Sequence, residues 1–376
     1  MSLQNNTISV RLFAKLMDFA TWLQNLPSRI VPPPFRLLQI GSAYWQSRAL
    51  HVAARLDIAT VLADESLSID VIAGRVSANA DALYRLLRML SAMDIFEEVS
   101  PRLFKNNRLS ACLREDNPNN VRAMILMHNS PEMSRPWFEQ LEQGVRSGAV
   151  PFELSHGREF YAYMDDHAEF DALFACAMDS VAALMGDHFA TDFAWGRFNR
   201  IIDIGGSKGS KSLAILKRHP QLTALVYDRE QVIQTAADYW AGQESSNVLA
   251  RLSYQAGDAL ESVPATKDDK DIYLLSAVLH GMDDEHCVKV LRNLATASAG
   301  SGARIALMEM VVPDSHADFA SASFDMQMFM ATRGRERTLA EWQRLFDDAD
   351  LALEEVVGLQ SMGQILVLKP ETCPAS

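Results

Sequence analysis

The chain has 376 residues, 48% of them hydrophobic and 22% charged, proportions that are ordinary for a soluble globular protein with room for two domains. Its net charge of −13 disfavours a nucleic-acid partner, because binding to phosphates needs a basic surface. The cysteines lack C-x-x-C spacing and no signal peptide is recognisable, which argues against a zinc ribbon or a disulfide framework and favours the cytoplasm; they are Cys112, Cys176, Cys287 and Cys373.

Residues 8–26 form the only run that could suggest a membrane segment. Arg11, Lys15 and Asp18 interrupt it, and such charges are costly in hydrocarbon, so we expect no membrane partner. Apolar residues at helical spacing instead predict an amphipathic arm that packs on this chain or on a second copy: Val10, Phe13, Leu16, Met17, Ala20 and Leu23. Prolines 32–34 are expected to end this arm as a stiff linker, which defines a first segment, 1–40.

Residues 41–120 predict a small helical module with a hairpin. A helix is expected over 47–64, and Ser68 and Asn79 suit the N-caps of two further helices. Residues 95–99 and 103–104 suit a hairpin, and three helices followed by a hairpin form the winged-helix arrangement. One interpretation is DNA binding through Arg85 and Arg88. The other, which the acidic chain favours, is a module that packs against another subunit.

Helical patterns continue through residues 121–190. The clearest is an apolar stripe at intervals of three and four residues, formed by Phe170, Leu173, Phe174, Ala177, Met178, Val181 and Leu184. A stripe of this kind is more often core than binding site. We therefore interpret this region as helices that connect two domains.

From residue 191 to residue 376, strands alternate with helices, which predicts an α/β domain with a Rossmann-like, mainly parallel sheet. The expected strands are 200–204, 224–227, 252–255, 271–276, 304–308, 353–358 and 364–368, the last two forming an antiparallel edge hairpin. Ligands of such sheets bind beyond the carboxyl ends of the strands, where strand order reverses. This rule gathers Gly205, Asp228, Asp258, His280 and Glu309 around one crevice.

A glycine turn follows the first of these strands. Asp203, Gly205 and Gly209 have the spacing D-x-G-x-x-x-G, whereas the dinucleotide pattern G-x-G-x-x-G would need glycine in place of Ser207. In α/β enzymes the observed spacing more often accompanies S-adenosylmethionine (SAM), which has no pyrophosphate to place on the helix N-terminus. Asp228 ends the second strand, where it would accept hydrogen bonds from the ribose diol.

Asp258 follows the third strand and has two interpretations. It either accepts a hydrogen bond from the adenine amino group or serves an ordinary Gly-Asp turn. The residues alone do not separate the two.

His280 follows an almost wholly apolar strand and is the candidate general base, because the pKa of histidine lies near the operating pH. An isolated histidine is more often satisfied by its own loop. Here Glu309 ends the next strand and Glu336 precedes a helix that begins near residue 339, and a nearby carboxylate would fix the tautomer and raise the pKa of the imidazole. Asp283 suits a helix N-cap better than a metal site, and no metal is expected.

In order and spacing these motifs resemble the SAM-dependent small-molecule O-methyltransferases of the caffeic acid and hydroxyindole type, above all their bacterial natural-product members. The resemblance runs over residues 44–369 and rests on segments 82–88, 203–206, 257–258, 278–280, 284–287, 308–309 and 334–338. It implies a homodimer formed through the winged-helix module, a small aromatic acceptor, and SAM as the cofactor, released as S-adenosylhomocysteine.

The resemblance also implies roles for individual residues. His280 falls on the catalytic base, with Glu309 and Glu336 as supporting acids. The implied cofactor contacts, on residues 191–376, are Asp203, Gly205, Gly206, Gly209, Asp228, Asp258 and Ser276. The implied substrate contacts, on the connecting helices of 121–190 and before the Arg-Glu-Arg motif, are Phe174, Met178, Asp325, Met326, Phe329 and Met330. Thioether side chains suit a planar aromatic acceptor.

The chain departs from the family pattern at two places. Ser207-Lys208 replaces the usual Gly-Thr, and Lys208 would meet the SAM carboxylate or face solvent. Gly281-Met282 follows His280 where Asp-Trp or Asn-Trp is usual, which leaves the acceptor open. The alternatives are therefore C- or N-methylation, or SAM chemistry without methyl transfer, on the same fold. An NAD-dependent oxidoreductase, which Ser207 disfavours, and a DNA-binding regulator are more distant alternatives.

Overall fold

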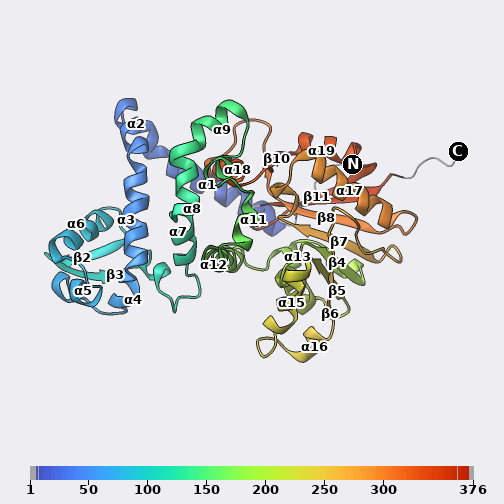
Figure 1. Ribbon diagram of the computed structural model, residues 1–376, viewed down its shortest axis with the longest axis horizontal. Helices are drawn as coiled ribbons and strands as arrows, with labels where there is room; N and C mark the ends of the chain where they lie inside the picture. Colours follow the sequence, from blue (N-terminus) through green and yellow to red (C-terminus); the bar gives the residue numbers. More distant parts are fainter. Residues whose placement is uncertain (1–5, 7, 362, 372–376) are drawn as a thin grey trace. The chain divides into compact units, whose positions relative to one another are not determined.

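The computed structural model describes residue 6, residues 8–361 and residues 363–371, and its largest element is a seven-stranded sheet. The chain divides into two units, Met1–Asp18 with Gly186–Ser376 and Phe19–Met185. The seven-stranded sheet belongs to the first unit, and a three-stranded sheet belongs to the second (Figure 1). Each unit buries its own hydrophobic core.

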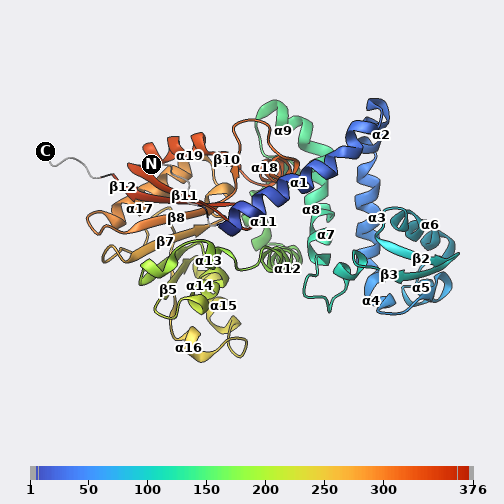
Figure 2. The ribbon, with the colours of Figure 1, turned by 180° about the vertical axis from the view of Figure 1, so that it is seen from behind.

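The large sheet, seen from behind in Figure 2, has the strand order β11-β12-β8-β7-β4-β5-β6. Its strands are β4 (Arg200–Ile204), β5 (Thr223–Asp228), β6 (Leu252–Ala256), β7 (Asp271–Ser276), β8 (Arg304–Glu309), β11 (Leu351–Gly358) and β12 (Gln364–Pro370). Strands β4 to β8 pair in parallel, whereas β12 runs antiparallel to both β8 and β11. The predicted mixed sheet and its edge hairpin are confirmed.

Helices cover both faces because alternate residues of each strand point to opposite sides. On one face, Ile272 and Leu274 pack in a cluster with apolar residues of α14 (Ser210–Arg218). On the other face, Tyr273 and Leu275 pack in a cluster with α17 (Asp284–Ser298) and α19 (Leu339–Asp347). The shorter elements of this unit are α13 (Phe189–Asp192), η3 (Trp195–Arg197), α15 (Glu230–Tyr239), α16 (Ser246–Leu249), η4 (Leu279–Gly281), β9 (Val311–Val312), α18 (Phe319–Ala331) and β10 (Arg337–Thr338).

The second unit begins with the helical module and its hairpin. Its elements are α3 (Ala43–Arg55), α4 (Ile58–Leu62), β1 (Leu67–Ser68), α5 (Ile69–Arg75), α6 (Ala80–Ser91), β2 (Phe96–Ser100), β3 (Leu103–Asn106) and η1 (Ser110–Leu113). The predicted caps are confirmed, since Ser68 accepts from Val71 N and Asn79 from Asp81 N and Ala82 N. The single helix expected over 47–64 is wrong: Asp57, with φ of 54°, takes a left-handed conformation that separates α3 from α4.

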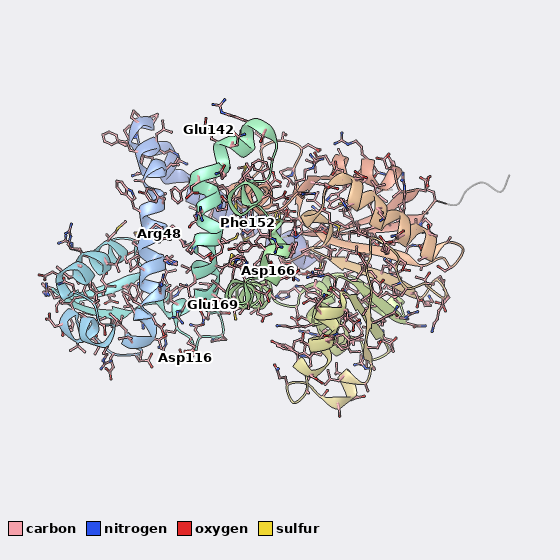
Figure 3. All side chains as sticks on the ribbon, viewed as in Figure 1. Arg48, Asp116, Glu142, Phe152, Asp166 and Glu169 are labelled. Carbon is pink, nitrogen blue, oxygen red and sulfur yellow. The ribbon has the colours of Figure 1, made fainter. Side chains whose placement is uncertain are left out.

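Further helices complete this unit: α7 (Arg122–His128), α8 (Pro131–Arg135), η2 (Pro136–Gln140), α9 (Leu141–Ser147), α10 (Pro151–His156), α11 (Phe160–Asp165) and α12 (Ala168–Met185). Figure 3 labels Arg48 on α3, whose Nη1 donates a 2.7 Å hydrogen bond to the carbonyl of Asn129, directly after α7. Phe152 on α10, also labelled, contacts the Phe160 ring edge-on at a centroid distance of 5.1 Å. The second unit therefore joins its module to the connecting helices by specific contacts.

The N-terminal arm is helical, as predicted, over α1 (Ile8–Ile30). The expected stiff linker is wrong: Pro33 and Pro34 begin a second helix, α2 (Pro33–Gly41), because proline has no N–H to lose in a first helical turn. Along the arm Val10 is buried, whereas Leu16 and Leu23 are 62% and 46% exposed. Among the described residues, no helix is both long and apolar enough to cross a membrane.

Candidate active site

The site is organised where the order of the parallel strands reverses. β4 and β7 are neighbours, yet the chain leaves β4 toward β5 and leaves β7 toward β8. The glycine loop (residues 205–209) follows β4, and the histidine loop (residues 277–283), which carries His280, follows β7. The two loops therefore meet at this point. A Cβ placed on Gly205 would lie 2.9 Å from Cγ2 of Val278, so only glycine lets the two loops come this close.

The glycine loop has a backbone that other residues adopt poorly. Gly205 and Gly209 have φ values of 68° and 82°. Gly206 has no room for a side chain, since a Cβ would lie 2.5 Å from the Asp203 carboxyl carbon. Below the loop, Trp240 Nε1 and Tyr254 OH both donate to the Lys208 carbonyl, at 2.7 and 3.0 Å. The loop is therefore fixed at both its glycines and its centre.

Lys208 has a defined place in this loop. Its ammonium lies 4.0 Å from the centroid of the Tyr239 ring, a cation–π contact. The contact joins Lys208 to α15, and the two possibilities raised by the sequence for this side chain stay predictions.

Acidic residues surround the glycine loop. Asp228 accepts the Ser207 N–H through Oδ2 at 2.8 Å, which places its carboxylate beside the loop. Asp258 accepts the Leu260 N–H through Oδ1 at 2.8 Å, the turn geometry that was one of its two interpretations. Asp203 lies beneath the loop, and burial raises its pKa to about 7. Its Oδ2 accepts the Ser212 hydroxyl at 2.7 Å.

These observations fit SAM as the bound group. Gly205, Gly206 and Gly209 leave three positions of the loop without side chains, and Oδ1 of Asp203 is a buried acceptor without a hydrogen-bond partner among the described residues. Asp228 retains further acceptor capacity after its two backbone bonds, because a carboxylate has about four lone-pair sites.

His280 and Glu336 form a buried hydrogen-bonded pair. His280 Nδ1 lies 2.7 Å from Oε1 of Glu336, whose side chain has no exposed surface. An ionised carboxylate can only accept, so Nδ1 carries the proton and Nε2 becomes the acceptor of the ring. Burial acts to lower the pKa of His280, but the hydrogen bond to Glu336 and the nearby carboxylates raise it above its ordinary value.

Glu309 hydrogen-bonds to the loop backbone rather than to the imidazole, on which it acts by its charge. Its Oε1 accepts from the N–H groups of Val278 and Leu279, at 3.1 and 3.0 Å. Burial raises the pKa of Glu309. The sequence places both acids near His280, but only Glu336 hydrogen-bonds to the ring.

Residues 334–337, around Glu336, contact the backbone of the histidine loop. A Cβ on Gly334 would overlap the His280 carbonyl oxygen, so the two backbones are in direct contact. Arg337 is fully buried and donates to the carbonyls of Leu279 and Met282, at 3.2 and 2.8 Å. It also donates to Asp284, through Nη2 at 2.8 Å. Arg337 thus joins three points of residues 279–284.

Met282, one of the two departures named in the sequence analysis, is partly buried and packs against the core on the α17 and α19 side of the sheet. Asp283 is an N-cap, as expected, because its Oδ1 accepts the His286 N–H at 2.9 Å. Within the described part of the chain, no group of three or more His, Cys, Asp or Glu residues is arranged to hold a metal ion.

The expected substrate contacts lie on two helices in different units. On α12, Phe174 and Met178 are half-buried, and on α18 Met326 is 36% exposed and Phe329 half-buried. Met330 has no exposed surface, so it can shape a pocket only from behind. Ser276 ends β7 and is half-buried.

The sequence missed two residues of this region. The Phe324 ring lies 6.1 Å from the His280 ring at an interplanar angle of 28°. Arg337 belongs to a recognised motif, but its contacts join segments more than 50 residues apart. The only available signal was the charge of Arg337 in a segment that borders a helix.

A glycine loop and a histidine loop that meet at a sheet's switch point place the chain among the SAM-dependent methyltransferases. The chain belongs to the O-methyltransferase family: its O-methyltransferase domain matches residues 138–351, and an O-methyltransferase dimerisation domain matches residues 38–116.

Individual relatives agree with this assignment. The chain is 31% identical over 347 residues to the phenazine O-methyltransferase PhzM of Lysobacter antibioticus, covering 92% of this chain and 99% of that protein. It is also 31% identical over 333 residues to phenazine-1-carboxylate N-methyltransferase of Pseudomonas aeruginosa, covering 88% and 96%. The solved structure of CalO1, a calicheamicin methyltransferase with bound S-adenosylhomocysteine, has a TM-score of 0.77 at 29% identity, covering 90% and 98%.

Proposed function

We propose that this chain transfers the methyl group of SAM to a hydroxyl of a small, planar aromatic acceptor, with His280 as the general base. The observation that carries the proposal is the 2.7 Å contact between His280 Nδ1 and buried Glu336. His280 belongs to the loop that touches the glycine loop through Gly205 and Val278. Methylation of a hydroxyl group needs a base to remove its proton. The Glu336 contact holds His280 in one tautomer for this task, beside the glycine loop that is proposed to bind SAM.

His280 would remove the proton that a phenol must lose. A phenol, with a pKa near 10, is a weak nucleophile at neutral pH, and Nε2 would accept its proton as the oxygen forms its bond to carbon. Bound SAM supplies an activated methyl whose carbon–sulfur bond breaks in the same step. The products are the methyl ether, S-adenosylhomocysteine and a protonated His280. General-base help of this kind contributes on the order of 10²–10⁴ in rate.

Specific residues are proposed to hold the cofactor. Gly205, Gly206 and Gly209 would admit its amino-acid end, with Asp203 and Ser276 beside it, because these three positions have no side chains to exclude it. Asp228 would accept from the ribose diol. Asp258 would accept from adenine with its Oδ2, since its Oδ1 already serves the turn.

The proposed acceptor is aromatic and polycyclic. Each unit offers partly exposed side chains that suit the faces and edges of rings: Phe174 and Met178 on α12 in one unit, and Met326 and Phe329 on α18 in the other. Met330 would support the α18 side chains from within the core. The phenazine O-methyltransferase relative supports a fused-ring acceptor.

N-methylation is the second candidate, because one relative of 31% identity is an N-methyltransferase acting on phenazine-1-carboxylate. An aromatic ring nitrogen attacks with a lone pair and loses no proton. Such a reaction would not depend on a general base. O-methylation therefore requires His280 as a base, whereas N-methylation does not.

We further propose a cytoplasmic homodimer that uses its winged-helix-like module for dimerisation rather than for DNA. Large apolar side chains are exposed next to and within the start of the matched dimerisation domain: Phe35, Leu37, Leu38, Ile40, Tyr44 and Trp45. Apolar surface of this extent is typical of a protein–protein interface. Cys112, Cys176 and Cys287 are free, which suits a reducing compartment, and Cys373 lies outside the described residues.

The test is turnover by His280→Gln. Incubation with SAM and a panel of hydroxylated phenazines and naphthalenes, followed by mass spectrometry of methyl ethers, identifies an acceptor. With it, His280→Gln should lower kcat at least about a hundredfold. Its affinity for S-adenosylhomocysteine, measured by calorimetry, should be unchanged. Wild-type turnover by the variant would refute the base, and wild-type turnover of a ring-nitrogen acceptor alone would establish N-methylation instead.

A further inference from the structure

Asp325 was expected to contact substrate, but its carboxylate accepts a hydrogen bond from the backbone of Glu336. It lies on α18, the helix that carries Met326 and Phe329, and it is half-buried. Its Oδ1 accepts a 2.9 Å hydrogen bond from the backbone N–H of Glu336, which lies 11 residues further along the chain. Its observed partner is therefore the residue that holds His280.

Glu336 needs support from its backbone. Its carboxylate is fixed at one point, because Oε1 contacts His280 while Oε2 has no hydrogen-bond partner among the described residues. Residues 332–336 form neither helix nor strand, so no regular hydrogen-bond ladder fixes them. One local bond, from Gly334 N–H to Thr332 Oγ1, measures 3.1 Å. The Asp325 bond instead acts directly on the residue that carries the carboxylate.

We propose that Asp325 is a positioning residue for the proposed methyl transfer: it fixes the backbone of Glu336 so that the Glu336 carboxylate meets Nδ1 of His280. The inference rests on the proposed function of His280. A hydrogen bond to an ionised acceptor is roughly twice as strong as one between neutral groups, so a carboxylate suits this task. Asp325 therefore joins the helix with the substrate contacts to the catalytic pair.

Phe324, the preceding residue, contacts the same pair from another side. Its ring lies 6.1 Å from the His280 imidazole. Adjacent residues of α18 thus reach both members of the pair, Phe324 through the ring of His280 and Asp325 through the backbone of Glu336. A shift of α18 on acceptor binding would consequently act on the base itself.

The two possible roles of Asp325 predict different kinetics. A substrate contact would raise KM for the acceptor and leave the titration of His280 unchanged. A positioning residue would lower kcat and move that titration, because the charges acting on His280 are those of Glu336, Glu309 and Arg337. Loss of the Asp325 bond would let the Glu336 carboxylate move away from the ring.

The experiment titrates His280 by NMR in full-length protein labelled with ¹⁵N-histidine, the resonance being assigned by its loss in His280→Gln. Asp325→Ala should bring the pKa of His280 down toward its ordinary value. It should also lower kcat about tenfold, less than loss of the base itself. Asp325→Asn keeps an oxygen acceptor and should restore most of both quantities.

Met326→Ala is the matched control, because it removes a proposed substrate contact from the neighbouring position. It should raise KM for a monohydroxyphenazine and leave the His280 titration unchanged. Calorimetric affinity for S-adenosylhomocysteine reports whether each variant is folded. An unchanged His280 titration in a folded Asp325→Ala protein would overturn the positioning role, whereas active His280→Gln would instead overturn the proposed function.

Discussion

The two loops that meet at the switch point are shaped by different means. The glycine loop owes its course mainly to its own residues, since Gly205 and Gly209 take positive φ and Gly206 has no room for a Cβ, while Trp240 and Tyr254 hold the Lys208 carbonyl. The histidine loop owes its course to residues that arrive from elsewhere, namely Glu309 and Arg337. Substitution of a single glycine in the glycine loop should therefore impair cofactor binding alone. In the histidine loop, which other segments hold, the property that is lost should depend on which contact is removed.

The largest effect is expected from Arg337→Met. The substitution keeps an apolar stem but removes the guanidinium donor from the carbonyls of Leu279 and Met282, of which the Leu279 carbonyl still accepts the Met282 N–H at 3.1 Å. A buried group that loses its donor costs about 1–3 kcal/mol, so the free energy of unfolding should fall by about 2 kcal/mol. Denaturant titration measures this loss.

Arg335→Met is the matched control for that measurement. Arg335 pairs with the same Asp284 carboxylate but its side chain is 45% exposed. Exposed ion pairs contribute about 0–1 kcal/mol, so this variant should remain close to wild type. Equal losses in the two variants would contradict the view that buried carbonyl contacts hold the histidine loop.

Glu336→Gln should produce the next largest effect, on the pH profile. Below its pKa His280 is protonated and cannot accept a proton, so kcat rises with pH through that pKa. The hydrogen bond and charge of Glu336 raise the pKa of His280 against the effect of burial. Without that charge the rising limb should move to lower pH, and the plateau should fall about tenfold, or about 1.4 kcal/mol, because the base is weaker.

Glu354→Gln controls for the loss of one carboxylate. Glu354 pairs with Arg304 and is partly exposed, and it makes no contribution to the pKa of His280. Its pH profile should match that of the wild type. A rising limb that stays in place in Glu336→Gln would mean that another group titrates in the profile.

The same contrast explains how far the sequence predicts the site. The glycine loop was recognised from residues 203–209 alone, because the spacing of its glycines is a local consequence of its backbone. The strands and the caps at Ser68, Asn79 and Asp283 were predicted for the same reason. Local patterns report local geometry.

The contacts between distant segments could not be read in this way. The sequence placed Glu309 near His280, but not its bonds to the backbone of the histidine loop, and it gave Asp325 to the substrate rather than to Glu336. These contacts depend on how segments far apart in the sequence pack together. A side chain placed near such a site could bond to any of several groups. The left-handed Asp57 that divides α3 from α4 was missed because an apolar helical pattern continues across it.

Gly206→Ala should break the glycine loop alone. The added Cβ would lie 2.5 Å from the Asp203 carboxyl carbon, and the loop must move to relieve that contact. We expect the affinity for S-adenosylhomocysteine to fall at least tenfold, or about 1.4 kcal/mol, in calorimetry. The histidine titration should be unchanged, because the added carbon acts on Asp203 rather than on Val278.

Gly74→Ala is the control for an added methyl group. A Cβ on Gly74, inside α5, meets nothing within 4 Å. Alanine is favoured over glycine in a helix by about 0.8–1.0 kcal/mol, so stability should rise slightly and cofactor affinity should be unaffected. Normal cofactor affinity in Gly206→Ala would show that the loop tolerates a side chain after all.

Thr338→Ala should have the smallest effect and the most restricted one. Thr338 follows Arg337 in the same motif, yet its hydroxyl accepts the Glu341 N–H at 3.2 Å and caps α19. Loss of an N-cap costs about 1 kcal/mol, which denaturant titration detects, and kcat and the His280 titration should be unchanged. Thr338→Ser, which keeps the capping oxygen, should recover the stability. A fall in kcat in Thr338→Ala that exceeds its effect on folding would mean that the motif acts on the histidine loop as one unit, and that the division between Glu336, Arg337 and Thr338 is wrong.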